Sequence, residues 1–159
     1  MLTQLALQSR LRSHITLTKT EIMQGALVGV MRQVQNLRDN RQPAYGATTD
    51  HDWQWHIEGA LGEMALAKAL GVFWAGVGLF RGADVVNENV RTRSKHSYDL
   101  ILHPSDSDDW KYWLLTGCNG TYIIQGWCWG VDGKIDEYWQ DPAGGRPAYF
   151  VPQAALTPL

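Results

Sequence analysis

The feature that most constrains the fold is the order of two kinds of pattern along the chain. Two stretches with helical spacing come first, at 19–38 and 52–70, and only short stretches typical of strands follow them. When helices are grouped before strands, the helices usually pack on one sheet instead of alternating with its strands. This order therefore predicts an α+β chain.

The first helix is predicted from its start signal and its apolar spacing. Thr18 and Glu21 have the spacing of a capping box, so the helix should begin directly after Thr18. Apolar side chains then recur at helical intervals, at Ile22, Ala26, Val30, Val34 and Leu37. We expect an amphipathic helix whose polar, exposed side carries Arg32, Gln33 and Arg38.

The second helix is rich in small residues and ends at a glycine. Gly71 is suited to the position after a helix, where the backbone turns left-handed. The many Gly and Ala residues of 59–69 predict close packing against a sheet or another helix. Glu63 falls on the stripe that holds several of them, whereas Glu58 points about 140° away at 100° per residue.

Short strands are expected over the rest of the chain, separated by links rich in turn residues. Their predicted ranges are 14–17, 84–93, 98–103, 110–116, 121–129 and 148–151. We therefore expect an α/β sandwich with a central mixed sheet and helices packed on it. It would form a single domain over 1–159, with the N-terminal strand and helices in 14–70 and the sheet in 84–151.

Composition narrows the classes of protein. No apolar run approaches the roughly 18 residues that span a membrane, and the N-terminus is too polar for a signal peptide. We expect a cytoplasmic protein without a membrane partner. The net charge of −2 means that any DNA binding must depend on a local basic patch. Most of the eight tryptophans are expected in the core.

Four residues have the chemistry of a phosphodiesterase site. Glu63 lies on the second helix and Asp84 at the start of a strand, and both could bind Mg²⁺ or Mn²⁺. Asn89 could complete the metal shell, and Arg91 would lie on the same face of the strand and hold the phosphate. A metal bound there would polarise the phosphate and activate a water.

The ordered motifs resemble the PD-(D/E)xK nuclease superfamily. The sequence "GEMALAKALG", then Asp84, then Asn89-Val90-Arg91 follows the order of that family's helix acid, strand acid and catalytic triplet. The stretch from "YDLIL" to "GRPAYFVPQ" is similar to small phage-encoded proteins of this type. The resemblance implies a restriction-endonuclease-like core, DNA as partner and metal-dependent hydrolysis by a viral protein in the host cytoplasm.

Two departures from the family pattern leave two interpretations open. Asn89 replaces an acid, and Arg91 replaces a lysine and stays protonated, so neither supports full catalysis. The protein is either a hydrolase or a weakened remnant of one. Alternatively, it is an inactive nuclease-fold module that binds DNA or a protein partner, in an accessory, regulatory or virion role. Glu88 or Glu58 could supply an additional acid.

Several local alternatives also remain. Asp99 followed by Asp109-Trp110-Lys111 would satisfy the family pattern in another register. Arg91, Arg93 and Lys95 form a basic segment that could contact phosphates, or they could simply be solvated charges on an edge strand. Arg146 could lie near a phosphate, or its segment could be a turn. The first helix has no role in the motif and could either pack on the sheet or mediate a dimer.

Overall fold

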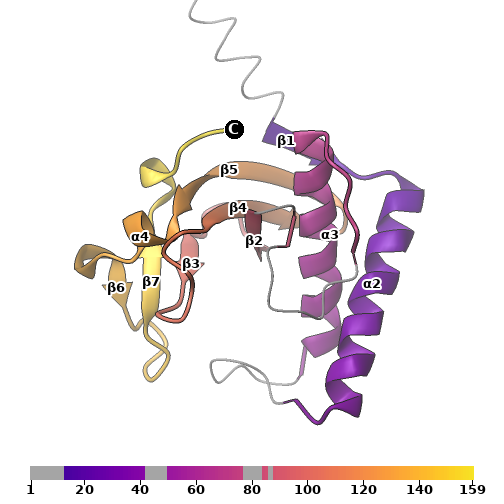
Figure 1. The fold of residues 1–159 in the computed structure, drawn as a ribbon, viewed down its shortest axis with the longest axis horizontal. Helices are drawn as coiled ribbons and strands as arrows, with labels where there is room; N and C mark the ends of the chain where they lie inside the picture. The colour runs from indigo at the N-terminus through magenta and orange to yellow at the C-terminus, as the bar shows by residue number, and fades with distance from the viewer. Residues whose placement is uncertain (1–12, 42–49, 77–83, 86–87) are drawn as a thin grey trace, which may run out of the picture.

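The computed structural model describes residues 13–41, 50–76, 84–85 and 88–159 (Figure 1). Two long helices come first: α2 (Lys19–Arg38) and α3 (Asp52–Leu70). The strands are β1 (His14–Thr16), β2 (Glu88–Arg93), β3 (Leu100–Leu102), β4 (Lys111–Cys118), β5 (Thr121–Trp129), β6 (Trp139–Gln140) and β7 (Ala148–Val151). Two short helical turns, α4 (Gly130–Gly133) and η2 (Asp136–Tyr138), lie between β5 and β6, and a third, η3 (Gln153–Ala155), follows β7.

The strands form two sheets. A four-stranded sheet has the order β1-β5-β4-β2, with β2 parallel to β4 and the other pairs antiparallel. Helices pack against this mixed sheet, so the predicted α+β class is confirmed. The second sheet, β3-β7-β6, was not predicted. The segment 98–103 was expected in the central sheet, but β3 pairs with β7 because Leu100 and Leu102 are needed in a separate core.

Strand β4 contributes to two hydrophobic cores, one on each of its faces. Trp113 and Leu115 belong to the core that α3 covers, whereas Tyr112 and Leu114 belong to the core under the second sheet. Neighbouring side chains of a strand point to opposite faces, so one strand can serve both cores. The central sheet is therefore the middle layer of the fold, with helices on one side and the small sheet on the other (Figure 1).

The predicted helix boundaries are confirmed, including the capping box at Thr18 and the left-handed Gly71, whose φ is 68°. The strand predicted at 84–93 begins later, at Glu88. Before it, Val85 and Glu88 exchange backbone hydrogen bonds of 2.9 and 2.7 Å. Asp84 consequently lies outside the strand, a correction to the prediction.

Helix α3 lies between α2 and the central sheet, and its residues from Ala60 to Ala67 are all buried. Small residues make this possible. A Cβ on Gly62 would lie 1.9 Å from Thr92 Oγ1 of β2. On the other side, a Cβ on Gly29 of α2 would lie 2.4 Å from Ile57 Cα. The glycines thus let α3 approach both neighbours at backbone distance.

Helix α2 is turned differently from the prediction. Arg32 and Gln33 were expected on the exposed side, but Gln33 is only 4% exposed and Arg32 points toward α3. The opposite face is apolar and exposed. Its large side chains are 51–60% exposed: Met23, Leu27, Met31, Val34 and Leu37. The helix therefore presents its apolar stripe to the outside.

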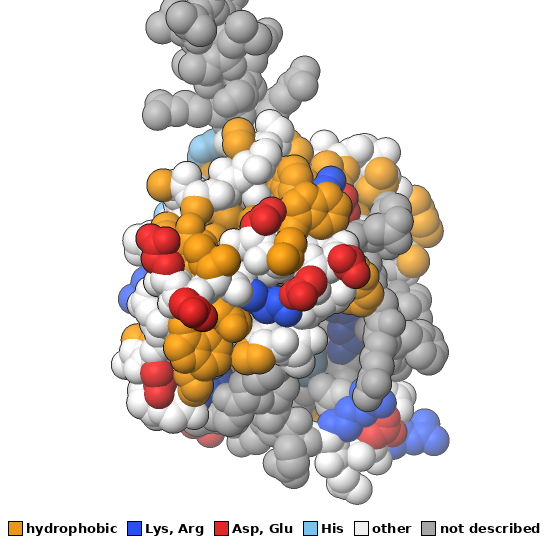
Figure 2. Space-filling view, turned by 60° about the vertical axis from the view of Figure 1, so that its left-hand side comes forward, with side chains coloured by type: hydrophobic (Ala, Val, Ile, Leu, Met, Phe, Trp, Pro, Cys, Tyr) orange, Lys and Arg blue, Asp and Glu red, His pale blue; other side chains and the backbone are white. Residues whose placement is uncertain are grey.

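The tryptophans also depart from expectation, because several are exposed by 37–47%: Trp53, Trp55, Trp110, Trp129 and Trp139. Figure 2 shows the side of the second sheet, where hydrophobic side chains lie among acidic ones. Among the described residues, no helix is both long and apolar enough to cross a membrane.

The close contact between α2 and α3 gives a first prediction. In Gly29→Ala the new methyl group meets backbone atoms of α3, so we expect the free energy of unfolding to fall by about 1–3 kcal/mol. Gly59→Ala is the matched control, since no atom lies within 4 Å of its Cβ and alanine favours the helix by about 0.5–1 kcal/mol. Urea unfolding of both variants measures the difference, and equal stability would contradict the close packing.

Candidate functional site

Glu63, the predicted helix acid, is engaged by two neighbours. Its side chain is buried, and both oxygens accept hydrogen bonds from the Arg32 guanidinium, at 2.6 and 2.8 Å. Trp74 Nε1 donates a further bond of 3.2 Å. Burial disfavours the charge of Arg32, but the hydrogen bonds and the charge of Glu63 raise its pKa overall. Glu63 is thus half of a bidentate ion pair between α2 and α3.

Asp84 lies close enough to Glu63 for the two carboxylates to interact electrostatically. Burial, and then the Glu63 carboxylate, raise the pKa of Asp84 from an ordinary value of 3.8 to about 6. The opposing effects are a 2.8 Å hydrogen bond from Val90 N to Oδ2 and the charges of Arg91 and Arg32. The structure therefore brings the two predicted metal-binding acids together, and one of them is ionised at an energetic cost.

Asn89 and Arg91 lie on the other face of β2. Thr92 contacts α3 at Gly62 and Val90 belongs to the same core, so the alternate residues point toward the second sheet. Arg91 donates a 2.8 Å hydrogen bond to Asp106, and its guanidinium lies 5.1 Å from the centre of the Tyr112 ring. Asp84 lies at the edge of β2, near enough to both Glu63 and Arg91 for their charges to act on it, whereas Glu63 and the Asn89–Arg91 pair lie on opposite faces of the strand.

The two additional acids have structural partners. Glu88 accepts a hydrogen bond from Trp113 Nε1 and lies 3.6 Å from Lys111 Nζ. Glu58 holds the turn between β4 and β5, accepting from Asn119 N at 3.0 Å and from Tyr122 Oη at 2.6 Å. In the alternative register, Asp109 is exposed in a turn while Lys111 pairs with Glu88. Glu88 and Glu58 are therefore held by other residues and not by Asp84 or Glu63.

The described side chains do not fit a Mg²⁺ or Mn²⁺ ion in this arrangement. Such an ion takes several oxygen ligands, and here both oxygens of Glu63 already bind Arg32. Asn89 points to the other face, where its Nδ2 is buried without a hydrogen-bond partner. Within the described ranges, no three His, Cys, Asp or Glu side chains form a group that could hold a metal. We derive no hydrolytic step from this geometry.

A cleft of about 850 Å³ runs along β2, beside the first turns of α3. Three arginines line it, Arg91 and Arg93 from β2 and Arg146 from the segment before β7. Two aromatic side chains, Trp55 and Tyr98, also contribute to its walls. An adjoining cavity of about 580 Å³ shares Trp55, Arg93 and Arg146 with it, so the two form one continuous depression.

Basic residues outnumber acidic ones in the lining of the cleft, although Arg91 is ion-paired with Asp106. Glu58 is the one acidic residue among the described residues that line it, against three arginines. Burial lowers the pKa of His103, and the charges of Arg91 and Arg146 lower it further, against the opposing charge of Asp106. Both arginines must therefore lie near this histidine. Burial in this wall also lowers the pKa of Arg93.

The predicted phosphate-binding residues are placed at or beside the cleft. Arg91 and Arg93 line it, and Arg93 lies over the Tyr98 ring at 4.4 Å. Lys95 Nζ lies 5.4 Å from the same ring, so it stands at the cleft's edge. Sequence reasoning missed Trp55, because exposure of a tryptophan leaves no signal in a single sequence. It also missed the inward turn of Arg32.

The Arg32–Glu63 pair gives a second prediction. Removing one partner leaves a buried charge, so Arg32→Met or Glu63→Leu should each cost about 3 kcal/mol of unfolding free energy. The double variant should cost less than either single one, because no unpaired charge remains. The exposed Glu21–Lys68 pair is the control, and Lys68→Met should change stability by less than about 1 kcal/mol. Denaturant unfolding measures all four variants, and two additive single effects would contradict a buried pair.

Asp84 gives a third prediction, on pH. Its folded pKa of about 6 exceeds its ordinary 3.8, so the folded state holds more protons between these values. The Asp84 contribution to stability must then fall as pH rises from about 4 to about 6, and stay low above. Asp84→Asn keeps an oxygen for Val90 N and should be more stable than the native chain at pH 7.5 by roughly 2 kcal/mol.

The measurement is the difference in unfolding free energy between the two chains at pH 4 and pH 7.5. We expect this difference to shrink at pH 4, where the carboxyl group is neutral in the native chain. A difference that does not change with pH would contradict a raised pKa at Asp84. Asp109→Asn, at an exposed carboxylate, is the control and should show no such pH dependence.

Comparison with known proteins adds no assignment. No protein-family model, no curated protein and no solved structure gives a significant match to this chain. The likeness to PD-(D/E)xK nucleases therefore depends on the motif residues alone. The geometry of the cleft and of the acidic pair is what bears on function.

Proposed function

We propose that the protein binds a single-stranded nucleic acid in the cleft along β2. The observation that carries this proposal is the convergence of three arginines and two aromatic side chains on one concave surface. Arginines contact phosphates in bidentate fashion, and aromatic rings stack on bases of any sequence. This assignment corresponds to the nuclease-fold binding module that the sequence left open.

The shape of the cleft favours a single strand over a duplex. Trp55 is 47% exposed and lines both parts of the depression, so an unpaired base could stack on it. Bases of a duplex are already stacked on one another. A protein normally reads a duplex with an element that protrudes into a groove about 12 Å wide, whereas this surface is hollow.

The distribution of charge supports the same location. The chain as a whole is slightly acidic, so a polyanion must bind where arginines are concentrated. On the side of the second sheet, exposed acids instead surround apolar residues, as Figure 2 shows. The exposed acids of α4 and η2, beside the second sheet, are Asp132, Asp136 and Glu137. That side would repel a phosphate backbone.

The fourth prediction tests the cleft with fluorescently labelled oligonucleotides. Anisotropy titrations should show tighter binding to a single strand than to the matching duplex, with an affinity that falls as salt rises. Arg146→Gln should weaken binding by about tenfold through a lost phosphate contact, and Trp55→Ala by a similar factor through lost stacking.

Matched controls are available for both variants. Trp53 is exposed to 46% but does not line the cleft, so Trp53→Ala should bind like the native chain. Arg41 is an exposed arginine paired with Asp39 outside the cleft, and Arg41→Gln should also bind normally. Equal losses in cleft and control variants would exclude this cleft as the binding site. Undetectable binding at low salt would exclude the proposed function.

Hydrolysis of the bound strand is a second candidate, favoured by one observation. Asp84 is held at an energetic cost beside a second carboxylate, which is common at functional sites. This candidate requires Glu63 to exchange the Arg32 guanidinium for a cation. Cleavage assays on single-stranded and duplex DNA with Mg²⁺ or Mn²⁺ would test it. Activity that Asp84→Asn abolishes would support hydrolysis, and equal background in both chains would exclude it.

A further inference from the structure

The cavity of about 580 Å³ that adjoins the cleft forms a chamber of its own. Its walls come from the first turn of α3, from β2 and β3, and from the segment between 142 and 150. The loop between β6 and β7 lies at the same end of the molecule as the first turn of α3 (Figure 1). Pockets that enclose a small molecule have volumes of roughly 300–1,000 Å³. The chamber therefore has room for one nucleotide of a strand that lies in the cleft.

Most of the chamber's surface is apolar or aromatic. Ile101 of β3 and Phe150 of β7 are directly opposite each other in the second sheet, so their side chains share one face. Pro142 and Pro147 add apolar surface from the loop before β7. Trp55 contributes an exposed aromatic ring from α3. Surfaces of this kind suit the face of a nucleobase, which can stack on them whatever its identity.

The charged side chains of the chamber are basic. Arg93 and Arg146 line it, and the described part of its lining contains no acidic residue. The guanidinium of Arg93 lies 4.4 Å from the centre of the Tyr98 ring and donates a hydrogen bond of 3.0 Å to Asp99 O, so its position is well defined. Arginines placed in this way favour a phosphate over a neutral ligand.

The loop that carries Arg146 is held in shape by one carboxylate. Asp141 Oδ2 accepts a hydrogen bond of 2.6 Å from Gly145 N, and Oδ1 accepts one of 3.0 Å from Arg146 N. These bonds lower the pKa of Asp141, so its carboxylate is ionised at neutral pH. Gly144 and Gly145 have φ values of 71° and 91°, which other residues rarely adopt. Asp141 thus positions Arg146 and is not itself among the residues that line the chamber.

We propose that the chamber takes one nucleotide of the bound strand, with the base against Trp55 and the apolar walls and the phosphate on Arg146. This inference rests on the proposed function, because the chamber is part of the same depression. The neighbouring nucleotides would lie in the cleft, along Arg91 and β2. The base in the chamber is enclosed on several sides, so it should contribute more to affinity than a base that stacks at the open surface.

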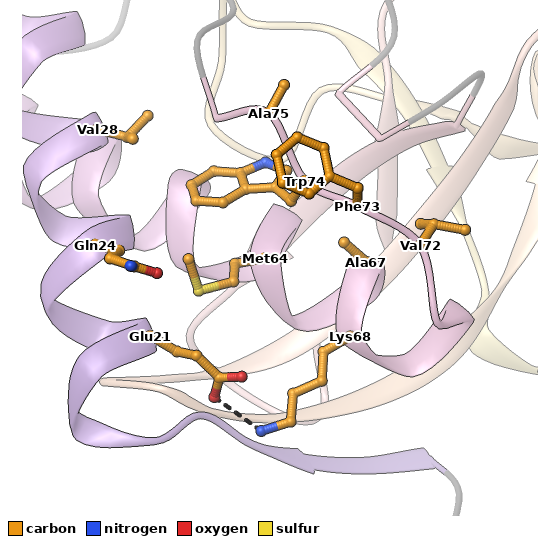
Figure 3. Close-up of a pocket in the computed structure, with 10 residues that line it drawn as sticks. All are labelled: Glu21, Gln24, Val28, Met64, Ala67, Lys68, Val72, Phe73, Trp74 and Ala75. Atoms are coloured by element: carbon orange, nitrogen blue, oxygen red, sulfur yellow. Dashed lines mark hydrogen bonds and ion pairs between the residues drawn. The ribbon is translucent and has the colours of Figure 1, made fainter.

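A second hollow, beside α2, lacks this combination of groups (Figure 3). It has a volume of about 460 Å³ and aromatic walls from Phe73 and Trp74. Among the described residues that line it, the one cation is Lys68, and it already pairs with Glu21 at 2.8 Å. A phosphate that entered this hollow would meet the Glu21 carboxylate. Because Phe73 is 89% exposed there, it offers a control for an aromatic side chain outside the chamber.

The fifth prediction concerns a single nucleotide. Calorimetric or NMR titration of the full chain should show that thymidine monophosphate binds by itself. Deoxyribose phosphate lacks the base and thymidine lacks the phosphate, so each should bind at least about tenfold more weakly. Phe73→Ser should bind thymidine monophosphate like the native chain.

Ala143→Glu tests the location, because it adds a carboxylate to a chamber whose described lining has none. It should weaken the binding of thymidine monophosphate, and of a single strand, by about tenfold. Ala154→Glu is the matched control, since it adds the same charge at an exposed alanine that lines neither the chamber nor the cleft. Its affinities should remain within about twofold of the native values. Both alanines are exposed, so both variants should fold.

A double-variant cycle tests the positioning role of Asp141. Asp141→Ala should weaken nucleotide binding about as much as Arg146→Gln does, although Asp141 does not line the chamber. The double variant should bind no more weakly than Arg146→Gln alone, because Asp141 acts through Arg146. Additive losses would overturn this role.

Three results decide the proposal. It is supported if thymidine monophosphate binds more tightly than either of its halves and Ala143→Glu alone weakens this binding. It is overturned, with the proposed function intact, if a single strand binds the native chain but Ala143→Glu and Ala154→Glu bind it equally well. Undetectable binding of any single strand at low salt would exclude the proposed function and this inference together.

Discussion

The buried ion pair between Arg32 and Glu63 is the interaction on which the arrangement of the helices depends. Arg32 must point toward α3, because its guanidinium binds both oxygens of a carboxylate that has little access to water. This requirement sets the rotation of α2 about its own axis. Gly25 and Gly29 then face α3 and let the two backbones approach. The large apolar side chains of α2 are left on the outside.

The same ion pair gives Glu63, the predicted catalytic acid, a structural partner. Glu63 lies where the nuclease motif would place it, next to Asp84, but its oxygens bind an arginine. Asn89 and Arg91 are separated from Glu63, because alternate residues of β2 face opposite sides of the sheet. Asp84, at the edge of the strand, is influenced by the charges of both Glu63 and Arg91. The motif residues thus serve two structures: a buried acidic pair under α3 and one wall of the arginine-lined cleft.

The cleft itself results from the way the strands divide into two sheets. Because β3 leaves the central sheet and pairs with β7, strand β2 ends that sheet. Arg91 and Arg93 of β2 therefore line one wall of the cleft. The first turns of α3 and the segment that contains Arg146 form the other walls. Edge strands usually carry charge to prevent unwanted pairing. Here the charges on the edge also form a surface suited to phosphates.

The sequence alone was enough to predict both helices to the residue, the capping box at Thr18 and the α+β class, because these depend on local spacing and backbone preference. It also indicated which residues carry charge near β2. It did not show which side of α2 is buried, which residues of β2 meet α3, or that a second sheet exists. Those outcomes depend on pairings between distant residues, such as Arg32 with Glu63 and Leu100 with Val151. The spacing of apolar residues shows that α2 has two faces. The ion pair between Arg32 and Glu63 determines which face is buried.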